Sequence, residues 1–119
     1  MSALIAYSSH SLWQQTFKDL LAACDRRSFV FSNLLELKDF LHQVDHKVIA
    51  IEEGSSTVDV SLINEFCALE ATKVVLITDK SEGLRDLDTR VSVVIKPVAH
   101  KQLAGLIESL LMELAPDGK

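Results

Sequence analysis

Five short apolar segments alternate along this chain with longer segments in which apolar residues recur every three or four positions. The short segments span residues 4–7, 28–32, 48–51, 74–77 and 91–95. Residues 48–51 and 74–77 are uninterrupted apolar runs, which are typical of central strands in a parallel sheet. Because strands joined through helices form right-handed parallel units, the alternation predicts an α/β fold with a five-stranded parallel sheet and helices on both faces.

The repeat predicts a three-layer, flavodoxin-like arrangement with the strand order 2-1-3-4-5. In such sheets a functional site lies at the carboxyl ends of the strands, near the point where the strand order reverses. The residues that end or follow the first, third, fourth and fifth strands are therefore the candidates. They are Ser8 and Ser9, Glu52 and Glu53, Thr78, and Lys96.

Helical periodicity predicts helices over residues 12–24, 34–44, 60–69 and 100–114. Asn33, with Glu36 three positions later, is a variant of the capping box and marks the start of the second helix. Residues 81–88 have room only for a short helix around Leu84 and Leu87. In the first helix the spacing predicts one buried stripe, made up of Leu12, Trp13, Phe17, Leu20, Leu21 and Cys24.

The length of 119 residues fits one compact domain, which we place at residues 1–115, with a tail or linker at 116–119. A formal net charge of -5 makes the surface repel nucleic-acid phosphates and anionic lipids, so protein partners are expected, with no nucleic acid and no membrane contact by this domain. The sequence contains neither an apolar stretch long enough to span a membrane nor a signal peptide pattern. A cytoplasmic location is therefore expected.

The cysteines and histidines suggest no metal centre. Cys24 and Cys67 lie far apart, without the spacing of a zinc site or a disulfide framework, and are expected to be buried thiols. The histidines also lack metal-ligand spacing and are expected on the surface. They are His10, His42, His46 and His100. The sequence thus predicts no metal and no cofactor.

The end of the last strand carries the most informative motif. Residues 93–97, Val-Val-Ile-Lys-Pro, close the repeat with a lysine and a proline, and residues 75–78, Val-Leu-Ile-Thr, end the fourth strand with a hydroxyl residue. With these features the chain resembles, over almost its whole length, the phosphorylatable receiver domain of bacterial two-component signalling. Thr78, Lys96 and Pro97 match that family in residue type.

Other positions depart from the family. Ser8 and Ser9 stand where receivers carry an acidic pair, and Glu52 stands where they carry the aspartate that accepts phosphate. Val93 stands where the family has an aromatic switch residue, three positions before the lysine. The hydroxyl residue and the lysine are 18 residues apart, about one helical turn less than is usual in the family. The resemblance implies a further helix between the fourth and fifth strands, and this helix is therefore expected to be shortened or irregular.

These departures predict that the phosphotransfer chemistry is lost. In the family, three acidic side chains hold Mg²⁺. Two of these positions carry neutral hydroxyls here, and hydroxyls do not replace the two negative charges. The extra methylene of Glu52 also moves its carboxylate by more than about 1 Å, which is a large misplacement for catalysis. The longer arm can instead reach toward Lys96 and Thr78 and pair with the lysine in the absence of phosphate. The degenerate phosphorylation pocket would consist of Ser8, Ser9, Glu52, Thr78 and Lys96.

The resemblance, together with these departures, predicts a pseudo-receiver that is not an enzyme. It would act as a protein interaction or domain-coupling module in a two-component sensor kinase or regulator, including one anchored in a membrane. The implied partner is a histidine kinase, a receiver or an adjacent domain of the same protein, with a homodimer as a further option.

An alternative is a flavodoxin-like domain that binds a flavin or a phosphate. Residues 7–11, Tyr-Ser-Ser-His-Ser, place hydroxyls at a helix amino terminus, where a phosphate can bind. The turn contains no glycine that would let backbone amides approach the phosphate closely. A phosphate-carrier or phosphatase-like domain is a third option, but no cysteine follows the first strand.

Overall fold

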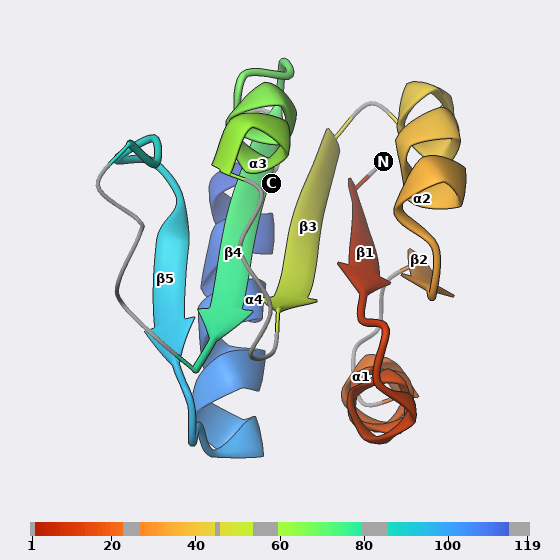
Figure 1. Cartoon of the computed structure of the whole chain (residues 1–119), viewed down its shortest axis with the longest axis vertical. Coiled ribbons are helices and arrows are strands. Elements are labelled where there is room, and N and C mark those ends of the chain that lie inside the picture. The colour runs from red at the N-terminus through yellow and green to blue at the C-terminus, as the bar shows by residue number, and fades with distance from the viewer. Residues whose placement is uncertain (1, 23–26, 45, 54–59, 80–85, 115–119) are drawn as a thin grey trace.

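Five strands form one parallel sheet in the order β2-β1-β3-β4-β5, which confirms the predicted fold class and strand order (Figure 1). The computed structural model describes residues 2–22, 27–44, 46–53, 60–79 and 86–114. The strands are β1 Ser2–Tyr7, β2 Arg27–Phe31, β3 His46–Glu53, β4 Thr72–Thr78 and β5 Ser92–Ile95.

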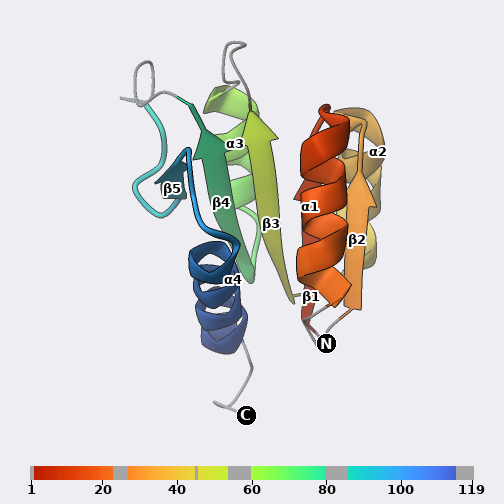
Figure 2. The same cartoon turned by 90° about the horizontal axis from the view of Figure 1, so that it is seen from below.

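Helices cover both faces of the sheet and give the predicted three layers. Figures 1 and 2 show α1 and α4 on one face and α2 and α3 on the other. A short 3₁₀ turn, Leu41–Gln43, continues α2. The helices are α1 Ser11–Ala22, α2 Leu34–Phe40, α3 Val60–Cys67 and α4 His100–Leu114.

The core is divided in two by the sheet, because successive side chains of a strand point to opposite faces. In β3, Val48 and Ala50 belong to the cluster beneath α1 and α4, whereas Ile49 and Ile51 belong to the cluster beneath α2 and α3. All four side chains are almost completely buried. This alternation also determines which face the next polar residue of β3, Glu52, must occupy.

The buried stripe of α1 is narrower than predicted. Trp13, Phe17 and Leu20 pack toward the sheet, but Leu12 is 80% exposed, so the prediction that it is buried is wrong. Each residue advances about 100° around a helix, which turns Leu12 away from the face that Trp13 shares with Phe17. Cys24, the last member of the predicted stripe, lies outside the described residues.

The predicted helices are present, but two of them end earlier than predicted. Asn33 caps α2 as expected, because its Oδ1 accepts hydrogen bonds from the backbone N–H groups of Leu35 at 2.8 Å and Glu36 at 3.4 Å. The α-helix ends at Phe40 rather than near residue 44, and α3 ends at Cys67 rather than at residue 69. The last helix has the predicted bounds.

The connection between β4 and β5 contains turns and no helix in its described part, residues 86–91. Residues 81–85 of the predicted short helix lie outside the described residues, as do residues 116–119 of the predicted tail. Asn64 of α3 binds this connection by donating to the Asp86 carbonyl at 2.9 Å and accepting from the Asp88 N–H at 2.7 Å. The β5 side chains Val93 and Ile95 are 40% and 43% exposed.

The remaining sequence expectations are largely met within the described residues. Cys67 is buried, and His10, His42 and His100 are exposed. His46 is half-buried, so its predicted surface position is wrong. None of the described helices combines the length and the apolar character needed to cross a membrane.

Candidate functional site

Glu52 is a carboxylate at the centre of the carboxyl edge of the sheet. It follows Val48 and Ala50 on the same face of β3, and strand alternation therefore directs it toward the side covered by α1 and α4. Only 1% of the residue is exposed. An ionised carboxylate buried to this extent requires close partners, because its water has been removed.

Ser8 supplies the first of these partners. It comes directly after β1 and is fully buried, and its backbone N–H donates to the carbonyl of Phe31 at 3.2 Å. Its hydroxyl donates to Glu52 Oε1 at 2.6 Å. The same hydroxyl oxygen accepts from the backbone N–H of His10 at 3.0 Å, and Gln14 donates to the Ser8 carbonyl at 2.8 Å. The start of α1 thus fixes the hydroxyl toward the carboxylate.

Lys96 supplies the second partner from the other side of the site. Its backbone N–H donates to the Thr78 carbonyl at 2.9 Å, which extends the β4–β5 pairing beyond the end of β5. Its Nζ donates to Glu52 Oε2, and its side chain is 16% exposed. Nζ also lies 3.7 Å from Asp79 Oδ1 and 5.2 Å from the centroid of the Trp13 ring. Lys96 and Glu52 therefore form the ion pair that the sequence suggested.

His10 and Trp13 are two residues of this site that the sequence analysis missed. The His10 side chain is 56% exposed, as expected of a surface residue, yet its Nδ1 lies 3.3 Å from Glu52 Oε1. Trp13 is half-buried and stacks near Lys96 within range of a cation–π interaction. Their place in the sequence, two and five residues beyond Ser8, was the available signal, because the start of α1 borders the carboxyl edge of the sheet.

Several solved structures are similar to this chain. The beryllofluoride-activated NtrC4 receiver domain dimer has a TM-score of 0.77 and 13% identity, covering 97% of this chain and 100% of that chain. A putative pilus assembly-related protein from Burkholderia pseudomallei has a TM-score of 0.73 and 14% identity, covering 100% and 95%. An atypical orphan response regulator with a phosphorylation-independent regulatory mechanism has a TM-score of 0.66 and 16% identity, covering 93% and 95%.

The chain has the receiver fold. No family model matches the sequence, and no curated protein sequence is detectably similar to it. The likeness therefore rests on the arrangement of the backbone, with the five parallel strands in the receiver order. The flavodoxin-like alternative is not favoured, since the Ser8 hydroxyl at the start of α1 is buried against a carboxylate rather than open to a phosphate.

Four of the five predicted pocket residues meet at one edge of this receiver fold. Ser8, Glu52 and Lys96 are joined by side-chain contacts, and the Thr78 carbonyl holds the Lys96 backbone. Thr78 itself is 1% exposed and lies opposite Ile95 in the β4–β5 register. Ser9 is exposed and makes no side-chain hydrogen bond within the described residues, so the structure does not bring it to Glu52.

The geometry leaves the Glu52 carboxylate fully engaged. One oxygen accepts from the Ser8 hydroxyl and lies next to His10, and the other accepts from the Lys96 ammonium. These contacts on both oxygens hold the carboxylate in place. Among the described residues, no group of three or more histidine, cysteine and acidic side chains is arranged to hold a metal ion.

Proposed function

We propose that this domain is a pseudo-receiver, a non-catalytic module that binds a protein partner or couples neighbouring domains in a two-component sensor kinase or regulator. It is not phosphorylated at the usual site. The observation that carries the proposal is the contact of the Glu52 carboxylate with both the Ser8 hydroxyl and the Lys96 ammonium. That contact occupies the lysine that would otherwise be available to a phosphoryl group.

The proposed degenerate phosphorylation pocket comprises Ser8, Ser9, Glu52, Thr78 and Lys96. Phosphoryl transfer depends on positioning and on charge neutralisation by a metal ion and cations. Here the positions of an acidic pair hold serines, and the pocket lysine, Lys96, is engaged by the buried carboxylate of Glu52. The ion pair would keep the carboxyl edge of the sheet in one state without phosphate.

The similarity to an atypical orphan response regulator supports this reading. That protein is described as having a phosphorylation-independent regulatory mechanism. The same type of regulation in this chain would work through docking alone. The module would comprise residues 1–115, would act in the cytoplasm and would require no cofactor.

A protein partner is the proposed ligand of the module, and the exposed face of β5 is one place for it to dock. Val93 and Ile95 leave apolar surface open beside a β4–β5 connection without a helix in its described part. The candidate partners are a histidine kinase, a receiver, an adjacent domain or a second copy. A net charge of -5 disfavours nucleic acid and anionic membranes as alternatives.

Intact mass spectrometry tests the central claim. The protein is incubated with acetyl phosphate or phosphoramidate in the presence of Mg²⁺, alongside the NtrC4 receiver domain as a positive control. We expect no mass gain for this chain. A stoichiometric gain of one phosphoryl group, labile to hydroxylamine and mapped to Glu52 or Glu53, would refute the proposal.

Binding measurements with purified histidine kinases and receivers of the same organism test the partner. The expected result is saturable binding that is weakened when Val93 and Ile95 are both replaced by threonine. Replacing the exposed Leu12 and Leu35 by threonine is the matched control, since these side chains are 80% and 73% exposed on α1 and α2. Equal weakening by both double variants would contradict docking on β5.

A further inference from the structure

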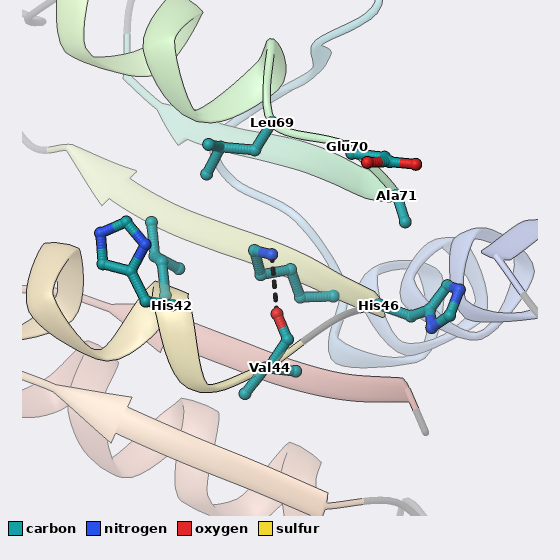
Figure 3. A pocket seen from close by; sticks show the side chains of 8 residues that line it. His42, Val44, His46, Leu69, Glu70 and Ala71 are labelled. Carbon is teal, nitrogen blue, oxygen red and sulfur yellow. Dashed lines mark hydrogen bonds between the residues drawn. The ribbon is translucent and has the colours of Figure 1, made fainter.

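An apolar groove of about 150 Å³ lies between α2 and α3, on the face of the sheet opposite α1 and α4. Leu41 and Phe66 form its floor and are 4% and 2% exposed. Leu69, which follows α3, is 37% exposed at its rim. Figure 3 shows Leu69 and His42 on the two sides of the gap, one on the α3 side and the other on the α2 side. The groove is therefore an apolar surface that is open to solvent.

The size and lining of the groove fit one aromatic side chain. An engineered apolar cavity of about 150 Å³ in another protein binds a benzene molecule. The lining here has the same character, because Leu41, Phe66 and Leu69 are joined by the aliphatic stem of Lys38. An aromatic side chain seated in an apolar pocket is a frequent anchor of protein interfaces.

The described residues around this groove carry more negative than positive charge. Glu65 lines the groove, and Glu70 lies next to Leu69 (Figure 3); both glutamates are exposed. Asp39, also exposed, follows Lys38 along α2. Lys38 Nζ lies 3.9 Å from Glu65 Oε1, but the two side chains are 53% and 62% exposed. Because such exposed pairs contribute little to stability, a cation of a partner can replace Lys38 beside Glu65.

We propose that the groove between α2 and α3 binds a protein segment in which an aromatic residue is flanked by lysine or arginine. The ring enters the groove over Leu41 and Phe66, and the flanking cations lie near Glu65 and Glu70. Acidic segments are disfavoured by the carboxylates around the groove and by the net charge of -5.

This docking surface is separate from the two surfaces already described. Figure 1 shows α3 between the groove and β5. Glu52 faces the opposite side of the sheet, beneath α1 and α4. The proposal therefore goes beyond the pseudo-receiver proposal and does not depend on the chemistry of the Glu52 pocket.

Titration of the full chain with the peptide acetyl-Lys-Lys-Phe-Lys-Lys-amide, followed by two-dimensional ¹H–¹⁵N NMR, tests the proposal. Saturable shifts are expected for residues 38–42 and 65–70, with no shifts for residues 8–10 and 93–95. A peptide with alanine in place of phenylalanine should bind about tenfold more weakly or worse, because it lacks the anchor. A peptide with glutamate in place of each lysine should show no saturable shifts. Equal affinity for the alanine peptide would overturn the role of the groove.

Substitutions in the protein examine the groove and its charged rim separately. Leu69→Trp changes a partly exposed residue and should fill the groove, which lowers the affinity for the peptide by about tenfold or more. Glu65→Gln together with Glu70→Gln should lower it by about threefold or more and weaken its dependence on salt. Asp19→Asn together with Glu108→Gln is the matched control, since these residues lie on α1 and α4, at the other face of the sheet. The glutamate pair remains a test even if Leu69→Trp does not fold.

Two further variants separate this inference from the earlier proposals. Peptide affinity should be unchanged within about twofold in Glu52→Gln and in the double variant Val93→Thr, Ile95→Thr, because neither change lies near the groove. Weaker binding in the β5 double variant would place the peptide on β5 and overturn the inference. Concentration-dependent shifts of residues 38–42 and 65–70 without peptide would show that a second copy occupies the groove instead. Unchanged affinity in both Leu69→Trp and the glutamate pair, or no saturable shifts in the native protein, would also overturn it.

Discussion

Lys96 and Glu52, 44 residues apart in the chain, form an ion pair in which the carboxylate side chain is fully buried and the lysine side chain is 16% exposed. The pair connects the end of the edge strand β5 to the end of the central strand β3. The Ser8 hydroxyl adds a third element, because it bonds to the other carboxylate oxygen from the end of β1. The carboxyl edge of the sheet is thus held together by three side chains.

A double-mutant cycle should show strong coupling between Glu52 and Lys96. Lys96→Met leaves a buried carboxylate without its cation and is expected to cost about 3–5 kcal/mol of unfolding free energy. Glu52→Gln keeps an oxygen that can accept from Ser8, but it places an uncharged amide next to the lysine. It is expected to lower the unfolding free energy by about 1–3 kcal/mol. The double variant should cost about 1–3 kcal/mol less than the sum. Urea unfolding provides these values.

The exposed pair Lys38–Glu65 provides the control for this cycle. Its charged atoms are 3.9 Å apart, and its side chains are 53% and 62% exposed. The cycle of Lys38→Met and Glu65→Gln should give a coupling below about 0.5 kcal/mol, as is usual for surface pairs. Additive effects at Glu52 and Lys96 would mean that this contact does not stabilise the domain.

The sequence predicts the fold better than it predicts the boundaries of its elements. The last helix is correct at both ends because its apolar periodicity is sustained over fifteen residues. The α2 prediction is too long because the apolar spacing through Leu41 and Val44 continues while the backbone tightens into a 3₁₀ turn. Both residues are buried, as the apolar spacing predicts, although the backbone is not α-helical there, so the spacing does not distinguish the two conformations.

Magnesium should leave the stability of the native protein unchanged and should affect a Ser8→Asp variant. A carboxylate at this position would face Glu52, because the Ser8 hydroxyl lies 2.6 Å from Glu52 Oε1. Two carboxylates at such a distance repel each other, and we expect the melting temperature to fall by about 5–10 °C in EDTA. Millimolar Mg²⁺ should recover part of the loss, because oxygen ligands of this kind suit the ion.

Ser8→Asn is the control, because asparagine has the size of aspartate without its charge. Its melting temperature should not change on addition of Mg²⁺. Differential scanning fluorimetry with and without Mg²⁺ provides the comparison. Saturable binding of Mg²⁺ to the native protein, with NMR shifts centred on residues 8–10 and 52, would show that a cation site survives without the acidic pair.

The site was less accessible to sequence analysis than the fold. Ser8, Glu52 and Lys96 could be selected because each lies at the end of a strand, and topology brings strand ends together. The place of His10, two residues beyond Ser8, indicates that it lies near the site, but its contact with Glu52 also depends on the path of the chain between β1 and α1. The burial of Lys47 was missed for a similar reason, since a lysine at the start of a strand is usually expected in solvent.

Asp88 should make stability depend on pH in the acidic range. Hydrogen bonds from the Arg90 side chain and backbone lower the pKa of Asp88 from 3.8 to about 2. A carboxyl group with a lowered folded-state pKa stabilises the protein fully above its unfolded-state pKa. That stabilisation is lost as the pH falls from about 4 through about 2. The stability difference between the native protein and Asp88→Asn should therefore shrink across this window.

The Arg90→Met variant provides the matching measurement. In the native protein the Arg90 side chain donates to the two Asp88 oxygens at 3.1 Å and 2.8 Å. Methionine has no donor and removes both hydrogen bonds. The carboxyl ¹³C titration of Asp88 should then move toward the ordinary midpoint near 3.8. A native midpoint already near that value would show that the Arg90 contacts do not persist in solution.

Ala71→Gly should stabilise the domain. Ala71 has a φ of 53°, a left-handed conformation that costs an alanine about 1–2 kcal/mol relative to glycine. Glycine loses more chain entropy on folding than alanine does, and this loss cancels about 0.4–1 kcal/mol of the gain. A net gain of about 0.5–1 kcal/mol in unfolding free energy is therefore expected. Ala104→Gly, the same change inside α4, should instead cost about 1 kcal/mol or more. A loss of similar size at both positions in urea unfolding would contradict the left-handed turn before β4.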